Sequence, residues 1–140
     1  MKRTDRHANR RFMILISCHR PDRAKKLHID TDVRRIVFII ETKNEKDTNA
    51  LETVRNIFSA KTKDFITAVD EKNIILVKEV KSNETYDDMN KIAKVIVDML
   101  NTEAMSSVHV SFGTIVNEIK EVSRSYKEAK RALVVGRIFY

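Results

Sequence analysis

Strand-like and helix-like segments alternate along this chain in an order that few folds accommodate. Runs rich in β-branched and apolar residues predict four strands, at residues 33–40, 65–69, 74–80 and 108–112. Amphipathic stretches predict helices between them, at residues 49–60 and 85–103. The order is therefore βαββαβ. With right-handed crossovers, this order gives an α+β domain of ferredoxin-like topology, in which helices pack on one face of a four-stranded antiparallel sheet.

Local signals mark the edges of these predicted elements. Residues 33–40 are rich in β-branched and apolar side chains and are apolar without a break from Ile36 to Ile40, which is typical of a central strand that is covered on both sides. The four polar residues 70–73 separate two strands and predict a hairpin loop. Thr85 and Asp88 stand at capping-box spacing, so we expect a long helix to begin there.

An extra helix is predicted at each end of the βαββαβ unit. Residues 6–19 are compatible with a connecting helix, which Pro21 ends because proline cannot continue a helix. Residues 123–139 predict a terminal helix with Ser125 and Glu128 at capping-box spacing. The sequence thus divides into a basic linker, residues 1–21, and one folded domain, residues 22–140.

Length and composition fit a single cytoplasmic domain. A chain of 140 residues with 42% hydrophobic side chains can bury one core. No apolar run approaches the ~20 residues of a membrane-spanning helix, so we expect no membrane contact. The one cysteine, Cys18, excludes an internal disulfide and indicates a reducing compartment.

The positive charge of the chain is confined to its beginning. Residues 1–28 contain nine of the 27 Lys and Arg residues but only two of the 20 Asp and Glu residues, so they carry the whole net charge of +7. A domain that binds nucleic acid usually gathers cations on its fold. We therefore expect a solvated basic linker and no direct contact of the domain with nucleic acid.

Two functions that share this topology find little support in the sequence. RNA-recognition domains stack bases on exposed aromatic residues of the middle strands, where this chain offers Phe38 alone. Nucleotidyl cyclases of the GGDEF type need glycines in the central hairpin turn and acidic Mg²⁺ ligands near it. The turn at residues 70–73 is Asp-Glu-Lys-Asn and has no glycine. We therefore predict no enzymatic activity and no catalytic residue.

A small polar group could nevertheless form a ligand pocket at the end of the sheet. It consists of four residues that follow the first strand or lie in the hairpin loop: Glu41, Lys43, Asp70 and Glu71. Cys18, His19 and His28 have no zinc spacing. We accordingly predict neither a metal site nor a cofactor.

Residues 123–133 carry the most distinctive motif. They read Ser-Tyr-x-Glu-Ala-x-x-Ala-Leu from position 125, with the motif residues Ser125, Tyr126, Glu128, Ala129, Ala132 and Leu133. This motif resembles a signature of the GGDEF-like domain in CdaR/PucR-type regulators of sugar-diacid and purine-catabolism genes. A strand that ends at Gly113, before the motif, and the segment 23–40 also resemble that domain, although His28 replaces a usual glycine.

The motif itself has a structural interpretation. Ser125 is expected to cap the terminal helix and Glu128 to complete its capping box. Ala129 and Ala132 are expected to allow close packing, and Tyr126 is expected to bury its ring. The motif would then hold the terminal helix on the sheet.

The resemblance implies a degenerate GGDEF-like domain that acts as a non-catalytic regulatory or dimerisation module in a bacterial transcriptional regulator. Its implied partners are a second copy and the sensory and helix-turn-helix domains of the same regulator. We expect the chain to be a fragment without that DNA-binding domain. The alternative is a domain that senses a nucleotide or small ligand in a degenerate cyclase pocket.

Overall fold

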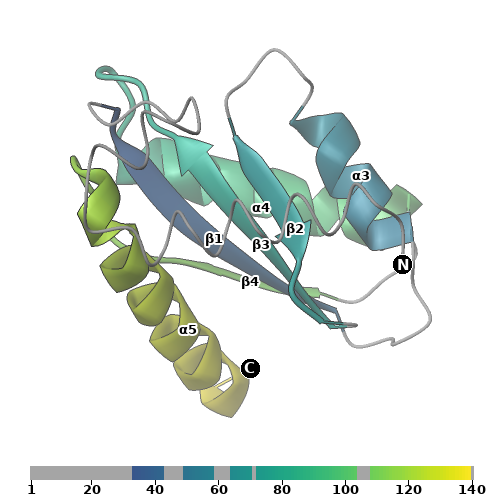
Figure 1. Cartoon of the computed structure of the whole chain (residues 1–140). Helices are drawn as coiled ribbons and strands as arrows, with labels where there is room; N and C mark the ends of the chain where they lie inside the picture. Colours follow the sequence, from purple (N-terminus) through teal and green to yellow (C-terminus); the bar gives the residue numbers. More distant parts are fainter. Residues whose placement is uncertain (1–32, 43–48, 59–63, 71, 104–107, 140) are drawn as a thin grey trace.

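The computed structural model describes residues 33–42, 49–58, 64–70, 72–103 and 108–139 (Figure 1). The described elements follow the order β1–α3–β2–β3–α4–β4–η1–α5, where η1 is a 3₁₀ turn. Their bounds are β1 Arg35–Thr42, α3 Asn49–Ile57, β2 Phe65–Ala68, β3 Asn73–Glu79, α4 Tyr86–Glu103, β4 Val108–Phe112, η1 Ile119–Glu121 and α5 Val122–Phe139. The predicted helix at residues 6–19 and the domain boundary at residue 21 lie outside these ranges.

The strands form a four-stranded sheet in the order β2-β3-β1-β4. Each neighbouring pair is antiparallel, with Val37 opposite Val77 between the two central strands. This is the ferredoxin-like arrangement that the βαββαβ order predicts. The predicted strand bounds agree with the observed ones within about two residues.

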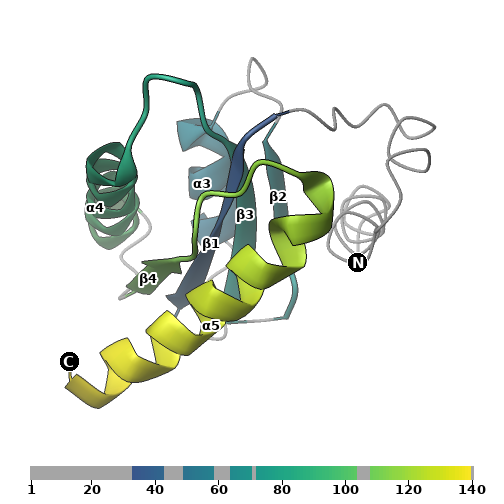
Figure 2. The same ribbon diagram turned by 90° about the vertical axis from the view of Figure 1, so that its left-hand side faces the viewer.

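Hydrophobic side chains of the central strands alternate between two clusters, one on each face of the sheet. Ile36, Phe38 and Ile40 pack with residues of α3 and α4. Val37 and Ile39 belong to the other cluster, which contains residues of α5. Successive strand residues point to opposite faces, and this explains why β1 is apolar at every position from Ile36 to Ile40. Figures 1 and 2 show α3 and α4 on one side of the sheet and α5 on the other.

Helix α5 lies on the face of the sheet that the two crossover helices leave open. The two crossover helices do share a face, as the right-handed crossovers require. The terminal helix covers the opposite face, where Val122, Ala129 and Leu133 pack against the central strands. Both faces of the sheet are therefore covered, as the apolar run at residues 33–40 predicted.

Helix α4 begins where the sequence places it. The Asp88 carboxylate accepts a hydrogen bond from the backbone N–H of Thr85, with 2.8 Å between the two atoms. This contact satisfies one of the amides that the first helical turn leaves without a partner.

Among the described residues, no helix is both long and apolar enough to cross a membrane.

Candidate functional site

The structure brings Glu41 next to the hairpin turn. Glu41 lies near the end of β1, opposite Asn73 on β3 and His109 on β4. The Thr42 amide, one residue further on, donates a 2.7 Å hydrogen bond to the Lys72 carbonyl. The grouping of Glu41 with the hairpin loop therefore follows from the adjacency of the two central strands. Lys43 and Glu71, the other two candidates for this pocket, lie outside the described residues.

Asp70 uses its carboxylate to hold the hairpin turn together. Its Oδ1 accepts hydrogen bonds from the backbone N–H groups of Lys72, at 2.8 Å, and Asn73, at 2.9 Å. The side-chain amide of Asn73 donates to both carboxylate oxygens. Such contacts are the ordinary way in which aspartate stabilises a turn. Asp70 thus has a structural role in this loop.

Burial raises the pKa of the Asp70 carboxyl, but other effects outweigh it and the pKa lies below its ordinary value of 3.8. These effects are the hydrogen bonds from Lys72 and Asn73 and the charge of Lys72. The folded chain therefore holds Asp70 ionised more readily than the unfolded chain does. Within the described residues, no group of three or more His, Cys, Asp or Glu side chains is arranged to hold a metal ion.

This lowered pKa predicts a pH dependence of stability. The stabilisation by ionised Asp70 is present above about pH 3.8 and is lost as the pH falls through the lower pKa of the folded state. Urea unfolding over a pH series should show the difference between the wild-type protein and Asp70→Asn shrinking in that acid range. Asn73→Ala keeps Asp70 but removes its side-chain partner, so it should reduce the dependence of the unfolding free energy on pH. Identical pH profiles for wild type and Asp70→Asn would contradict the prediction.

The motif residues of α5 form a second, internal site against β1 and β4. Ser125 is fully buried, and its Oγ accepts a 3.1 Å hydrogen bond from the backbone N–H of Val37. The helix begins at Val122, so Ser125 lies inside the first turn and does not cap it. This corrects the capping assignment of Ser125. The hydroxyl has a partner on the central strand, 88 residues away in sequence.

Val37 needs this partner because β4 departs from β1 at this point. The regular β1–β4 pairing ends at Phe38 opposite Phe112. The chain then returns to β1 at an isolated bridge between Arg35 and Val116. The amide of Gly113 donates to the carbonyl of Val37, at 3.0 Å, and Ser125 takes the amide on the same side of the strand. A side chain of α5 thus completes the hydrogen bonding of a buried strand residue.

Gly113 leaves room for this contact. A Cβ atom at this position would lie 2.0 Å from the backbone oxygen of Ser125 and 2.8 Å from its Oγ. These distances are well below any van der Waals contact, so only glycine fits without a shift of the backbone. In the sequence Gly113 marks only the end of a strand, because its contact with α5 is tertiary and leaves no local signal.

Ala129 and Glu128 extend the attachment along the helix. Ala129 is fully buried, and its carbonyl accepts a 2.7 Å hydrogen bond from the Ser111 hydroxyl on β4. The Thr114 hydroxyl donates to Glu128, which also pairs with Arg124 at 3.5 Å. Glu128 therefore braces the helix to the segment after β4, and it forms no capping box with Ser125.

The remaining motif residues divide between the core and the surface. Leu133 is buried, and the ring of Tyr126 packs against the same cluster while remaining partly exposed. Ala132 is exposed, so its expected role in close packing is wrong. Ala132, three residues after Ala129, therefore lies outside the contact between the helix and the sheet. The motif is thus largely an anchor for α5, as its structural interpretation proposed.

Together, the sheet order, the two crossover helices and the anchored terminal helix define an α+β domain with ferredoxin-like topology. The sequence profile of the GGDEF-like domain family matches residues 19–135. The chain belongs to this family. A solved structure of a microbial GGDEF domain, described for its interaction with bis-(3′,5′)-cyclic di-GMP, has 16% sequence identity and a TM-score of 0.49, covering 84% of this chain and 78% of that chain. Comparison with curated proteins gave no match.

Proposed function

We propose that this GGDEF-like domain is a non-catalytic regulatory and dimerisation module of a CdaR/PucR-type transcriptional regulator. The observation that carries the proposal is the anchoring of α5 by Ser125, Glu128 and Ala129, three residues of the motif that resembles that regulator class. Its proposed partners are a second copy and the neighbouring sensory and helix-turn-helix domains. A rigidly attached terminal helix suits a domain that transmits a change to a neighbour along the chain.

The hairpin turn supports the non-catalytic part of the proposal. A GGDEF-type cyclase needs a glycine-rich turn that lets the backbone approach the nucleotide, and acidic groups that hold Mg²⁺. Residues 70–73 contain no glycine, and the Asp70 carboxylate accepts hydrogen bonds from its own turn. A metal ion would have to compete with these contacts for the Asp70 oxygens.

Self-association can be measured directly on the chain. Sedimentation velocity over a wide range of protein concentrations should show a shift from a monomer to a dimer, because such regulators act on paired sites. A repeat at high salt would distinguish an apolar interface from one held by surface charges, which salt screens. A strict monomer at every concentration would exclude dimerisation as the role of this chain.

One observation favours the alternative of a ligand sensor: Glu41 lies beside the hairpin turn, opposite Asn73 and His109. Thermal unfolding with and without GTP and Mg²⁺ separates the two functions. A ligand at about 100 times its dissociation constant stabilises the folded state by about 2.7 kcal/mol, which raises Tm by several degrees. We expect no shift. A shift that Glu41→Gln abolishes would establish the sensor instead.

A further inference from the structure

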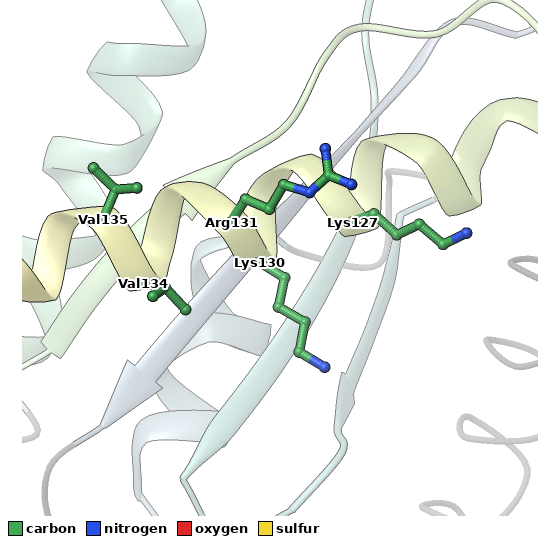
Figure 3. Close-up of a pocket in the computed structure, with 5 residues that line it drawn as sticks. All are labelled: Lys127, Lys130, Arg131, Val134 and Val135. Carbon is green, nitrogen blue, oxygen red and sulfur yellow. The ribbon is translucent and has the colours of Figure 1, made fainter.

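The outer face of α5, turned away from the sheet, combines cationic and aliphatic side chains. Lys127, Lys130, Arg131, Val134 and Val135 line a hollow of about 590 Å³ (Figure 3). In this view Lys127, Lys130 and Val134 extend to one flank of the helix, whereas Arg131 and Val135 extend to the other. All five side chains are exposed. The anchoring residues Ser125, Ala129 and Leu133 occupy the inner face and are not part of this surface.

The cations of this face lack acidic partners within the described part of the chain. Arg124, one turn earlier, pairs with Glu121 at 3.8 Å and with Glu128 at 3.5 Å. No carboxylate of the described residues pairs with Lys127, Lys130 or Arg131. The ammonium group of Lys130 instead lies 5.9 Å from the centre of the Tyr126 ring. Counting only the residues that the structure describes, the outer face therefore presents three positive charges without an acidic partner.

Two aliphatic side chains extend the cationic group toward the end of the helix. Val134 is 45% exposed and Val135 is 51% exposed, although Leu133 beside them is buried in the core. Positions 127, 130, 131 and 134 recur at intervals of three or four residues, so they form one face about two helical turns long. A ligand that fits this surface must offer negative charge and apolar area together.

We propose that the outer face of α5 binds an acidic amphipathic protein segment, whose carboxylates meet Lys127, Lys130 and Arg131 and whose aliphatic side chains cover Val134 and Val135. Charge complementarity selects this occupant. The α5 helix of a second copy would bring like charges together, which opposes association. Nucleic acid would satisfy the cations but would leave the two valines against a phosphate backbone. The proposal is independent of whether the domain is catalytic.

Binding can be tested with the full chain and a labelled peptide of about 15 residues, in which Leu and Glu alternate at helical spacing. Fluorescence anisotropy would follow the titration. The double variant Lys127→Glu/Lys130→Glu should weaken binding by about five- to tenfold, as expected for two lost surface ion pairs. Its matched control is Lys91→Glu/Lys94→Glu on the exposed surface of α4, which has the same charge change at the same spacing. The affinity of the control variant for the peptide should stay within about twofold of the wild-type value, because the substituted residues on α4 lie outside the proposed surface and distant sites act independently.

A second comparison tests the apolar part of the surface. Val134→Ser/Val135→Ser should also weaken the peptide, and a peptide with Ser in place of Leu should bind the wild-type chain more weakly. Circular dichroism would verify that each variant keeps its helices. If the charge variants of α4 and α5 lost peptide affinity equally, the proposal would be overturned, because the peptide would then be attracted by the overall positive charge of the chain and not by this surface. Binding of a DNA duplex that only the α5 variant weakens, without peptide binding, would also overturn it and identify a nucleic-acid surface.

Discussion

Replacing Gly113 with alanine is expected to destabilise the domain by about 3 kcal/mol, the upper end of the usual range for an overpacked core site. The added Cβ would lie 2.0 Å from the backbone oxygen of Ser125 and 2.7 Å from its carbonyl carbon. Both atoms belong to the backbone of α5, so a rotamer change cannot relieve the clash. Either the helix moves away from β1 or β4 shifts, and each loses contacts of a core cluster. Urea unfolding followed by circular dichroism would measure the loss.

The control for this variant adds atoms where the structure has room. Ala132→Leu enlarges an exposed side chain of the same helix, and its free energy of unfolding should change by less than about 0.5 kcal/mol. The change at Gly113 should also increase the exposure of α5 to proteolysis, since the helix would be held less firmly. A loss below about 1 kcal/mol for Gly113→Ala would mean that α5 does not pack on Gly113 as described.

Most of the fold could be predicted from the periodic spacing of apolar residues in the sequence. The four strands, their hairpin and the two crossover helices each bury a face with a regular apolar pattern, and such patterns are readable locally. The ferredoxin-like topology followed from the βαββαβ order together with the right-handedness of crossover connections. The face covered by α5 did not follow, because an amphipathic helix at the end of the chain can dock on either side of a sheet. Alternating residues of β1 pack on both sides and offer no preference.

The motif on α5 shows where local interpretation fails. Ser125 and Glu128 have capping-box spacing, yet Ser125 accepts a hydrogen bond from Val37 on β1, and Glu128 accepts one from Thr114 after β4. Capping rules consider only neighbouring residues, whereas these contacts arise from tertiary packing. The candidate pocket shows the reverse. Glu41 and the hairpin turn could be brought together from topology alone, but the carboxylate of Asp70 turned out to serve its own loop.

Helix α5 thus has two faces with different chemistry. Where its inner face meets the sheet, the helix has small, uncharged side chains, and Ser125 and Ala129 are fully buried there. Its outer face carries Lys127, Lys130 and Arg131 without acidic partners in the described residues. Because the inner contacts fix the rotation of the helix about its axis, they also determine which side chains face outward. Disturbing the anchor should therefore alter the outer surface as well.

Substituting Ser125 by alanine is expected to cost about 1 to 3 kcal/mol of folding free energy, because it leaves the buried N–H of Val37 without an acceptor. Water cannot replace the hydroxyl easily, since Ser125 and Val37 are both fully buried. Urea unfolding would measure the loss. Native-state hydrogen exchange would test the cause, because the Val37 amide should exchange faster in the variant.

A matched substitution separates the lost hydrogen bond from a general effect on the helix. Ser123→Ala removes a hydroxyl from a half-buried position two residues earlier, and it should change stability by less than about 0.5 kcal/mol. Ser125→Thr keeps the hydroxyl but adds a methyl group near Gly113, so it should destabilise through crowding without leaving the amide unpaired. If Ser125→Ala and Ser123→Ala had equal effects, and exchange at Val37 were unchanged, the hydrogen bond would not hold α5 to the sheet.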